Sequence, residues 1–472
     1  MKNNETLRAR LPVRLAPLLA ALVLAACASA PVTAPQVTAD LPAAFQNDGR
    51  WTAASPAEAQ PRGTWWKAFN DPALDALIER AARENTSLQV AAARLNQARA
   101  LARATDADRL PQVGAQAGVQ RTSQRALGNP PTTVGSVGAS LAWELDLFGR
   151  LAKASDAATL DVRAREALLR STTLLVQAQV AQSYFALRAL DSERAIVEDT
   201  GRAYADTLNL LERRYRAGDV AELEVARVRG EAAATQAEAL ALERQRARLE
   251  HTIAVLVGAP ATTLGVERAA WTTRAPVVPA GVPSTVLARR ADVAAAQASM
   301  NAALARVGVA QAAWFPSLSL TANGGVASPE LSDLFRSASK AWGVGALLSL
   351  PIFDGGRREA GIASARAELD ASAASYREQV LVAFQEVEDE LSSLRLLADQ
   401  EKAQNEAVDA AVRATTLSSA RWRNGLVSQL ELLDAQRSEL RNRREALKVR
   451  AAQHQATLGL IRALGGDWGT PA

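Results

Sequence analysis

Residues 136–150 read SVGASLAWELDLFGR, an alternating stretch that ends at a glycine and an arginine. From Ser136 to Leu147 every second side chain is apolar, and the side chains between them are small or polar. This period of two predicts a β-strand with one apolar face. From Arg150 the chain then runs to Ala217 without a proline. A helix of about 68 residues would be on the order of 100 Å long, which is more than an ordinary globular core accommodates.

The same order of features recurs in the second half of the chain. The pentapeptide RYRAG at 214–218 returns as RWRNG at 421–425, an offset of 207 residues. Pro111 and Phe148 return as Pro316 and Phe353 at an offset of 205, which places a two-residue insertion just before Arg357. A tandem repeat is therefore expected. Strands are predicted at about 113–147 and 317–350, and long helical hairpins at about 150–258 and 357–465.

An apolar stripe with coiled-coil spacing runs along the first long helix. Its members follow one another in steps of three, four and seven residues: Leu169, Val176, Val180, Leu187, Leu190, Val197, Tyr204, Leu208, Leu211 and Tyr215. Gly218 and Gly425 follow the two long helices, and glycine accepts the positive φ that a hairpin tip requires. An antiparallel return helix is expected after each glycine, near 219–257 and 426–464.

Strands of about 9–11 residues with one apolar face suit a tilted membrane strand. A half-buried sheet of a soluble protein has the same period and stays an alternative. If the four strands lie in a membrane, the sheet must close, because edge N–H and C=O groups have no partners in lipid. Two chains would give an eight-stranded barrel filled by side chains, and three would give twelve strands around a lumen. The small and polar second face favours the wet lumen.

The first residues have the features of a targeting signal. Residues 1–14 carry four basic side chains, and an apolar run then ends in Leu24-Ala25-Ala26-Cys27, which resembles a bacterial lipobox. Cys27 is the only cysteine of the chain, so we expect a signal peptide at 1–26 and a lipid on Cys27. Ala28 follows it rather than aspartate, which favours the outer membrane. The alternative is an ordinary secretory signal cleaved near Ala30. Residues 27–61, rich in proline, alanine and threonine, are expected to form an extended tether.

Composition excludes several classes of function. The formal charge is +4, of which residues 1–26 supply +3, so the remainder is nearly neutral and gives no support for nucleic-acid binding. One cysteine and two histidines, His251 and His454, are too few for the usual metal sites. The sequence contains no nucleotide-binding loop and no nucleophile–base constellation. We therefore expect no catalysis and no cofactor other than the covalent lipid.

Several segments resemble the TolC-like outer-membrane efflux family, within it the NodT/OprM-type lipoproteins of resistance-nodulation-division systems. They span about residues 60 to 468: WWKAFNDP at 65–72, WELDLFGR at 143–150, FPSLSL at 315–320, LPIFDGGR at 350–357, AFQEVE at 383–388 and ALGGDW at 463–468. One departure is Ala291, since the family usually has proline between the equivalents of Arg290 and Asp292. The resemblance implies repeats at 62–265 and 285–468, joined by a linker at 266–284 and followed by a tail at 469–472.

The resemblance also implies an architecture and partners. It predicts a mixed α/β fold, with four membrane strands and coiled-coil hairpins per chain. Three chains would form a twelve-stranded β-barrel continued by a periplasmic α-barrel. The expected partners are a periplasmic adaptor and an inner-membrane pump, and the expected location is the outer membrane. The function predicted is a passive exit duct for drugs or other small molecules, with the substrates left open. A type I secretion duct, a periplasmic coiled-coil adaptor and a lipid-anchored enzyme are the alternatives.

Charged and aromatic residues near the two glycines are the candidate site. Acidic residues of the second repeat narrow the periplasmic entrance in the family, and Glu431 and Asp434 match those positions. The repeat pairs these two acids with Glu224 and Arg227, and Arg421 lies ten residues before Glu431. We expect one or both of Arg227 and Arg421 to pair with the acids when the entrance is closed. Solvated helix charges are the competing interpretation. The tips, Tyr215 to Gly218 and Trp422 to Gly425, are the predicted docking surfaces for the adaptor.

Overall fold

The computed structural model describes residues 63–123, 131–278 and 289–466. Within these ranges the chain divides into two compact units. The first consists of residues 96–164 and 297–375, and the second consists of the described residues up to 95 with 165–296 and 376–466. Each unit thus draws on both sequence repeats. The repeat boundaries at 62–265 and 285–468 are positions along the chain and stay predictions.

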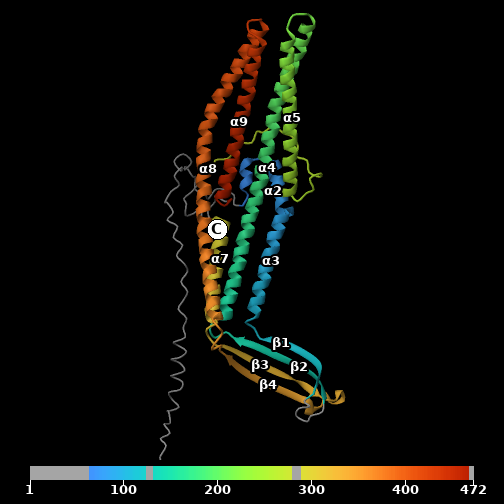
Figure 1. Ribbon diagram of the computed structural model, residues 1–472, viewed down its shortest axis with the longest axis vertical. Coiled ribbons are helices and arrows are strands. Elements are labelled where there is room, and N and C mark those ends of the chain that lie inside the picture. Colours follow the sequence, from blue (N-terminus) through green and yellow to red (C-terminus); the bar gives the residue numbers. More distant parts are fainter. Residues whose placement is uncertain (1–62, 124–130, 279–288, 467–472) are drawn as a thin grey trace, which may run out of the picture. The chain divides into compact units, whose positions relative to one another are not determined.

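The first unit contains one antiparallel sheet of four strands in the order β1-β2-β3-β4 (Figure 1). The strands are β1 (Gln112–Thr122), β2 (Thr132–Leu145), β3 (Ser317–Ser328) and β4 (Lys340–Ser349). Two short 3-10 turns, η5 (Leu331–Asp333) and η6 (Ser337–Ser339), lie between β3 and β4. Strands β1 and β4 are the two edges of this sheet, so each has one side without a strand partner among the described residues.

The strand register assigns every strand residue to one of two faces. Val113 pairs with Leu141, which pairs with Ala322, which pairs with Val344, so these four share one face. That face is apolar in all four strands, whereas the opposite face carries mainly glycine, serine and glutamine. Gly138 and Gly325 pair on the polar face, where a Cβ on Gly325 would overlap the backbone of β2. The predicted alternation is therefore confirmed in the register.

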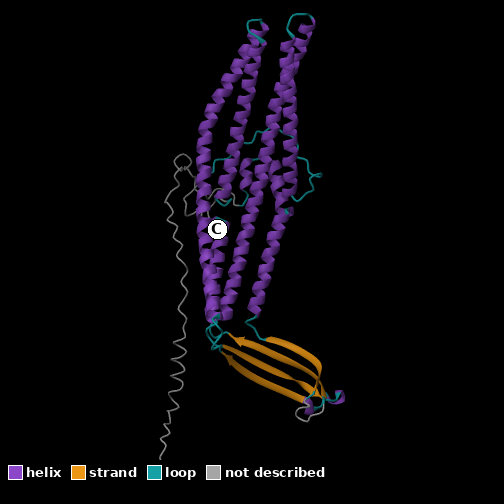
Figure 2. Ribbon diagram, viewed as in Figure 1, coloured by secondary structure: helices purple, strands orange, loops and turns teal. Residues whose placement is uncertain are grey.

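The helices are as long as the absence of proline predicts (Figure 2). Helices α4 (Arg150–Arg216) and α8 (Arg357–Arg423) have 67 residues each, and α5 (Glu222–Leu256) and α9 (Gln429–Ala463) have 35 each. The shorter helices are η3 (Trp65–Phe69), α2 (Pro72–Glu84), α3 (Thr86–Ala107) and α7 (Ala291–Ala312). Among the described helices, none combines the length and the hydropathy needed to cross a membrane.

Glycine ends all four long helices with the same hydrogen-bond pattern. After α4, Gly218 N donates to Tyr215 O and Asp219 N donates to Arg214 O, both at 2.9 Å. After α8, Gly425 N donates to Trp422 O and Leu426 N to Arg421 O, again at 2.9 Å. The glycines have φ of 80° and 69°. These are Schellman motifs, in which a left-handed residue lets the last helical carbonyls find partners. Gly258 and Gly465 end α5 and α9 in the same way.

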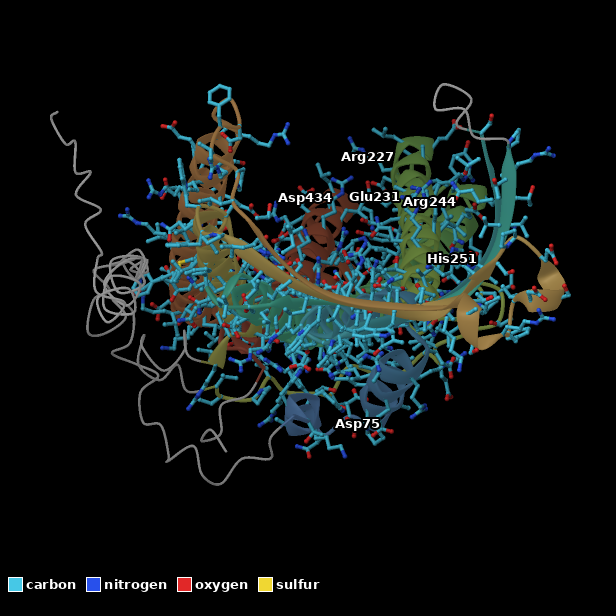
Figure 3. All side chains as sticks on the ribbon, turned by 90° about the horizontal axis from the view of Figure 1, so that it is seen from below. Asp75, Arg227, Glu231, Arg244, His251 and Asp434 are labelled. Carbon is cyan, nitrogen blue, oxygen red and sulfur yellow. The ribbon has the colours of Figure 1, made fainter. Side chains whose placement is uncertain are left out.

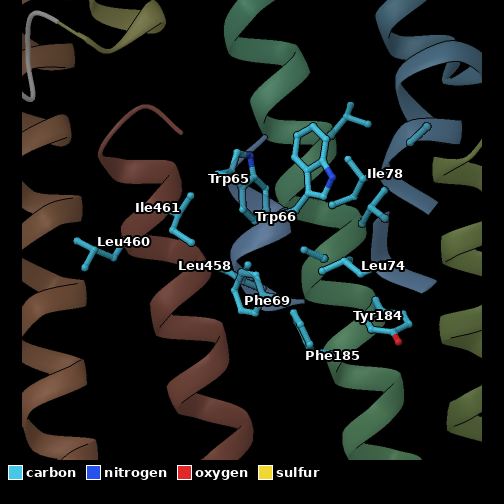
Figure 4. Close-up of a cluster of buried hydrophobic side chains, with 14 of the residues drawn as sticks. Trp65, Trp66, Phe69, Leu74, Ile78, Tyr184, Phe185, Leu458, Leu460 and Ile461 are labelled. Carbon is cyan, nitrogen blue, oxygen red and sulfur yellow. The ribbon is translucent and has the colours of Figure 1, made fainter. Parts of the chain in front are cut away.

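The main hydrophobic core of the second unit is built on the tryptophan-rich segment before α2 (Figure 4). Trp65, Trp66 and Phe69 are buried against Phe185 of α4 and Leu458 of α9. At the start of α2, the Asp71 carboxylate accepts hydrogen bonds from the backbone of Ala73 and Leu74 and from the Tyr184 hydroxyl. The segment WWKAFNDP thus supplies both a core and a helix cap.

A buried arginine, Arg290, lies directly before the first helix of the second repeat. Arg290 donates to Asp292 and Glu386, both at 2.6 Å, and to the carbonyl of Ala463 at 3.1 Å. Helix α7 still begins at Ala291, the position where the family usually has proline. A proline at the first helical position only fixes φ in advance, so alanine leaves the helix start in place.

Glu390 of α8 is a half-buried carboxyl that lies against Gly459 of α9. Burial raises the pKa of Glu390 to about 7. The positive charge of Arg462 lowers this pKa, and the negative charges of Asp389 and Glu386 raise it further. A carboxyl whose pKa is higher in the folded state stabilises the fold below its unfolded pKa, and this contribution is lost as the pH rises through about 7.

We therefore expect Glu390→Gln to stabilise the second unit at pH 8, by about 1–3 kcal/mol, and to change little at pH 5. Unfolding midpoints followed by helical circular dichroism at both pH values measure the difference. Glu378→Gln, an exposed carboxyl on the same helix, is the control. Equal effects of Glu390→Gln at the two pH values would contradict the prediction.

Candidate gate at the hairpin tips

The two hairpin tips present their aromatic residues differently. Tyr215, in the last turn of α4, is 44% exposed. Trp422, at the equivalent position of α8, is half-buried and packs on an apolar cluster. The two tip residues predicted to dock an adaptor are therefore not equivalent: Tyr215 is available at the surface, and Trp422 also holds the tip together.

That apolar cluster joins the two hairpins. It consists of Tyr204 and Leu211 of α4, Val225 and Val228 of α5, and Leu433 of α9. Burying such side chains stabilises an association by about 1.5–3 kcal/mol each, before the entropy of ordering is counted. Both return helices, α5 and α9, thus contribute to this cluster near the hairpin tips. The charged residues of the candidate gate are on the same helices.

Glu431 pairs with Arg421, one of the two arginines that the sequence singled out. The Arg421 Nη1–Glu431 Oε1 distance is 3.6 Å, and the side chains are 57% and 49% exposed. The pair connects the end of α8 with the first turn of α9. An exposed pair at this distance is worth less than about 1 kcal/mol. It can therefore be made and broken readily.

Asp434 pairs with Arg437, a residue that sequence reasoning did not single out. Arg437 Nη1 lies 3.3 Å from Asp434 Oδ1, one turn along α9. The same guanidinium donates through Nη2 to Glu231 of α5, in the other hairpin. The hydrogen bond to Glu231 raises the pKa of Arg437. Arg437 therefore connects Asp434, one predicted gate acid, with Glu231 of the other hairpin. Figure 3 labels these two acids.

Glu224 and Arg227 do not take part in these pairs. Arg227 is exposed on α5 (Figure 3), and Glu224 is half-buried one turn before it in the sequence. Among the described residues, neither side chain makes an ion pair within 4.0 Å. In this arrangement the basic partners of the two acids are Arg421 and Arg437.

A polar cavity of about 250 Å³ lies between the hairpins next to Arg437. Tyr204, Glu231, Glu238, Arg441 and Arg444 line it together with neighbouring side chains. Within the described part of the chain, the Tyr204 hydroxyl is buried without a hydrogen-bond partner, and burial raises the pKa of Tyr204 to about 12. The phenol therefore stays neutral at any physiological pH.

The remaining predicted residues lie outside this region. Cys27 is outside the described residues. His251 is exposed on α5, and His454 is buried on α9 with both ring nitrogens facing backbone carbonyls, those of Arg450 and Thr273. In the described ranges, no group of three or more histidine, cysteine, aspartate or glutamate side chains is arranged to hold a metal ion.

Comparisons with known proteins agree with the geometry. The family model described as outer membrane efflux protein matches residues 77–259 and 282–466. The cation efflux system protein CusC of Escherichia coli is 32% identical over 466 residues, which is 97% of this chain and 99% of that protein. The pyoverdine export outer membrane protein OpmQ of Pseudomonas putida is 34% identical over 471 residues, covering 97% and 98%. The solved outer-membrane channel OprN superposes with a TM-score of 0.84 at 31% identity, covering 92% of this chain and 99% of that chain.

Proposed function

The chain belongs to the outer membrane efflux protein family and forms the outer-membrane channel of an efflux pump, and we propose that it is the passive exit duct for small molecules delivered by an inner-membrane pump through a periplasmic adaptor. The fold class is the predicted TolC-like one, and the family consists of channels rather than enzymes. A resistance-nodulation-division pump is the partner proposed, as the sequence resemblance implies.

One observation carries the proposal: a four-stranded sheet with an apolar face, a polar face and two edges that have no strand partner in the described part of the chain. Open edges are not tolerated in lipid, so β1 and β4 must pair with other copies. Three copies supply twelve strands, which enclose a lumen lined by the small polar face. The closed trimer therefore provides a water-filled path through the membrane.

The substrates of the relatives differ, which supports a duct that does not select by chemistry. One relative is named for cations, another for pyoverdine, and a third for solvents. We propose that the substrate range of this chain is likewise set by its pump. A type I secretion duct would have the same architecture, but the names of these relatives favour efflux. A periplasmic adaptor is not retained, because the matched family is one of outer-membrane channels.

The exit-duct function has a direct test. In cells that lack their own channel, this chain should restore resistance to pump substrates, and outer-membrane fractions should contain trimers that dissociate on heating. Purified trimers should conduct ions in planar bilayers. Monomeric protein without conductance would contradict the proposal.

We also propose that Cys27 carries the lipid anchor, because the lipobox places the only cysteine at the one position that the modification needs. Cys27→Ser should remove incorporated palmitate completely. Trimers should persist in this variant, because strand pairing and not the lipid closes the barrel. The control is Ser123→Ala, which keeps the lipobox intact. Label retained by the Cys27→Ser protein would refute the assignment.

The charged residues beside the tips are proposed to form a gate. In a trimer, three copies each of Glu431 and Asp434 would surround one axis, and closure would require their neutralisation. The pairs Arg421–Glu431 and Arg437–Asp434 support this proposal, because each predicted acid has its own basic partner. The tips at Tyr215 and Trp422 remain the proposed adaptor-docking surfaces.

A further inference from the structure

The membrane strands carry very few charged side chains, and these are distributed unequally between the two faces of the sheet. Among the described strand residues, the charged ones are Arg121, Glu144 and Lys340. Glu144 lies on the polar face and is paired with Arg150 at 2.9 Å. Arg121 and Lys340 both lie on the apolar face. Arg121 is two residues after Val119, and Lys340 is two residues before Trp342, so each shares a face with that apolar residue. The lipid-facing side of the sheet therefore has two charges, both positive.

Both cations lie at the same end of the sheet. Arg121 is near the end of β1, and Lys340 begins β4, so both adjoin the loops that connect β1 to β2 and β3 to β4. The opposite strand ends adjoin the long helices. Because the helices of these channels extend into the periplasm, the loops are at the outer surface. A cation at the centre of a lipid face costs about 2–4 kcal/mol, but much less at an interface.

Exposed aromatic side chains mark the outer interface at this end. Trp342, two residues inward from Lys340 on the same face, is 81% exposed, and Phe335 in the preceding loop is 78% exposed. Tryptophan and other aromatic residues gather where a barrel passes from hydrocarbon to headgroups. Lys340 therefore lies at headgroup level, just outside this aromatic residue.

Neither cation has an acidic partner among the described residues. The loop after Arg121, residues 123–131, contains no aspartate or glutamate in its sequence. In the other loop, Asp333 is already paired with Arg336 at 3.2 Å, which leaves Glu330 as its second acid. Neither Arg121 nor Lys340 has an ion pair within 4.0 Å in the described ranges. Two unneutralised cations at headgroup level favour an anionic group supplied by the lipid.

Barrel closure would place the two cations at the same end of adjacent strands. Arg121 is on one edge strand and Lys340 is on the other, so in the trimer they lie on paired strands of neighbouring chains. Paired strands are about 4.8 Å apart, and both side chains are on the lipid face at the outer end. We propose that each of the three subunit seams binds the phosphate of an outer-leaflet glycolipid between Arg121 of one chain and Lys340 of the next. This inference rests on the trimeric duct proposed above.

Purified full-length trimers test the site with three lipids: bis-phosphorylated lipid A, its dephosphorylated form, and phosphatidylglycerol. Bound lipid per trimer is counted by native mass spectrometry, and the temperature at which trimers dissociate is followed on gels. We expect phosphorylated lipid A to bind and to raise the dissociation temperature. Arg121→Gln and Lys340→Gln should each weaken binding about fivefold, and the double variant about thirtyfold.

The control is the double variant Arg170→Gln and Lys402→Gln, which removes the same charge from exposed helix positions and should bind like the wild type. Wild-type affinity in the Arg121/Lys340 double variant would overturn the site. So would equal binding of dephosphorylated lipid A or of phosphatidylglycerol, because phosphate on a glycolipid would then not be what the seam recognises. Trimers that bind no lipid overturn the site alone, whereas monomers without conductance overturn the duct as well.

Discussion

Gly218→Pro and Gly425→Pro are each expected to abolish efflux while trimers still assemble. The two glycines have φ of 80° and 69°, and proline is restricted to about −65°. Proline would also remove the N–H groups that donate to Tyr215 O and Trp422 O at 2.9 Å. The Schellman motif is therefore lost, which destabilises the hairpin tip by about 3 kcal/mol or more. The backbone that carries Tyr215 or Trp422 then adopts a different conformation.

The strands that close the barrel belong to the other compact unit, so heat-sensitive trimers should survive. Resistance to pump substrates and trimer content in outer-membrane fractions are measured on the same cells. Gly425→Asn is the matched control, because asparagine tolerates the left-handed region and should keep most of the activity. A second control, Gly361→Ala, adds a methyl group to open space on α8 and should be silent. Normal resistance in both proline variants would show that the adaptor does not depend on the tips.

Much of this fold could be predicted from the sequence because its elements repeat and are long. Alternation over 136–147 located β2, and the absence of proline after Arg150 predicted a helix to about Ala217, which in the structure ends at Arg216. The glycines at the tips were identified because the same pentapeptide pattern occurs twice. Such signals can be read from the sequence because the period of a strand and the end of a helix depend on residues that are close together along the chain.

The partners of the gate acids could not be found in the same way. Arg227 occupies the position in the first repeat that Asp434 occupies in the second. Ion pairs, however, depend on which helix faces which, and no local sequence pattern contains that information. Arg437 corresponds to Gly230 in the first repeat, so comparing the repeats conceals it. Its link to Glu231 spans 206 residues and two hairpins. The half-buried position of Trp422 has the same origin, since it depends on a cluster to which α4, α5 and α9 all contribute.

The gate should respond in opposite ways to the loss of its bases and of its acids. In the proposed gate, six carboxylates around one axis would repel one another by roughly 1 kcal/mol per close pair in water, and by more when desolvated. Arg421 and Arg437 offset this repulsion through the pairs at 3.6 Å and 3.3 Å. Arg437 also ties α9 to Glu231 of the neighbouring hairpin, so its removal loosens both a charge pair and a contact between helices.

We expect Arg421→Ser with Arg437→Ser to raise single-trimer conductance in planar bilayers severalfold, because the acids are then unpaired and closure is opposed. Glu431→Ala with Asp434→Ala should leave the resting conductance low and remove the preference for cations that an acidic ring produces. Arg227→Ser is the control: this exposed side chain has no partner acid here and should change neither quantity. Low salt should enlarge the conductance effect, because screening weakens repulsion between exposed carboxylates. Unchanged conductance in the double arginine variant, together with wild-type cation preference in the double acid variant, would mean that Glu431 and Asp434 are solvated helix charges and not a gate.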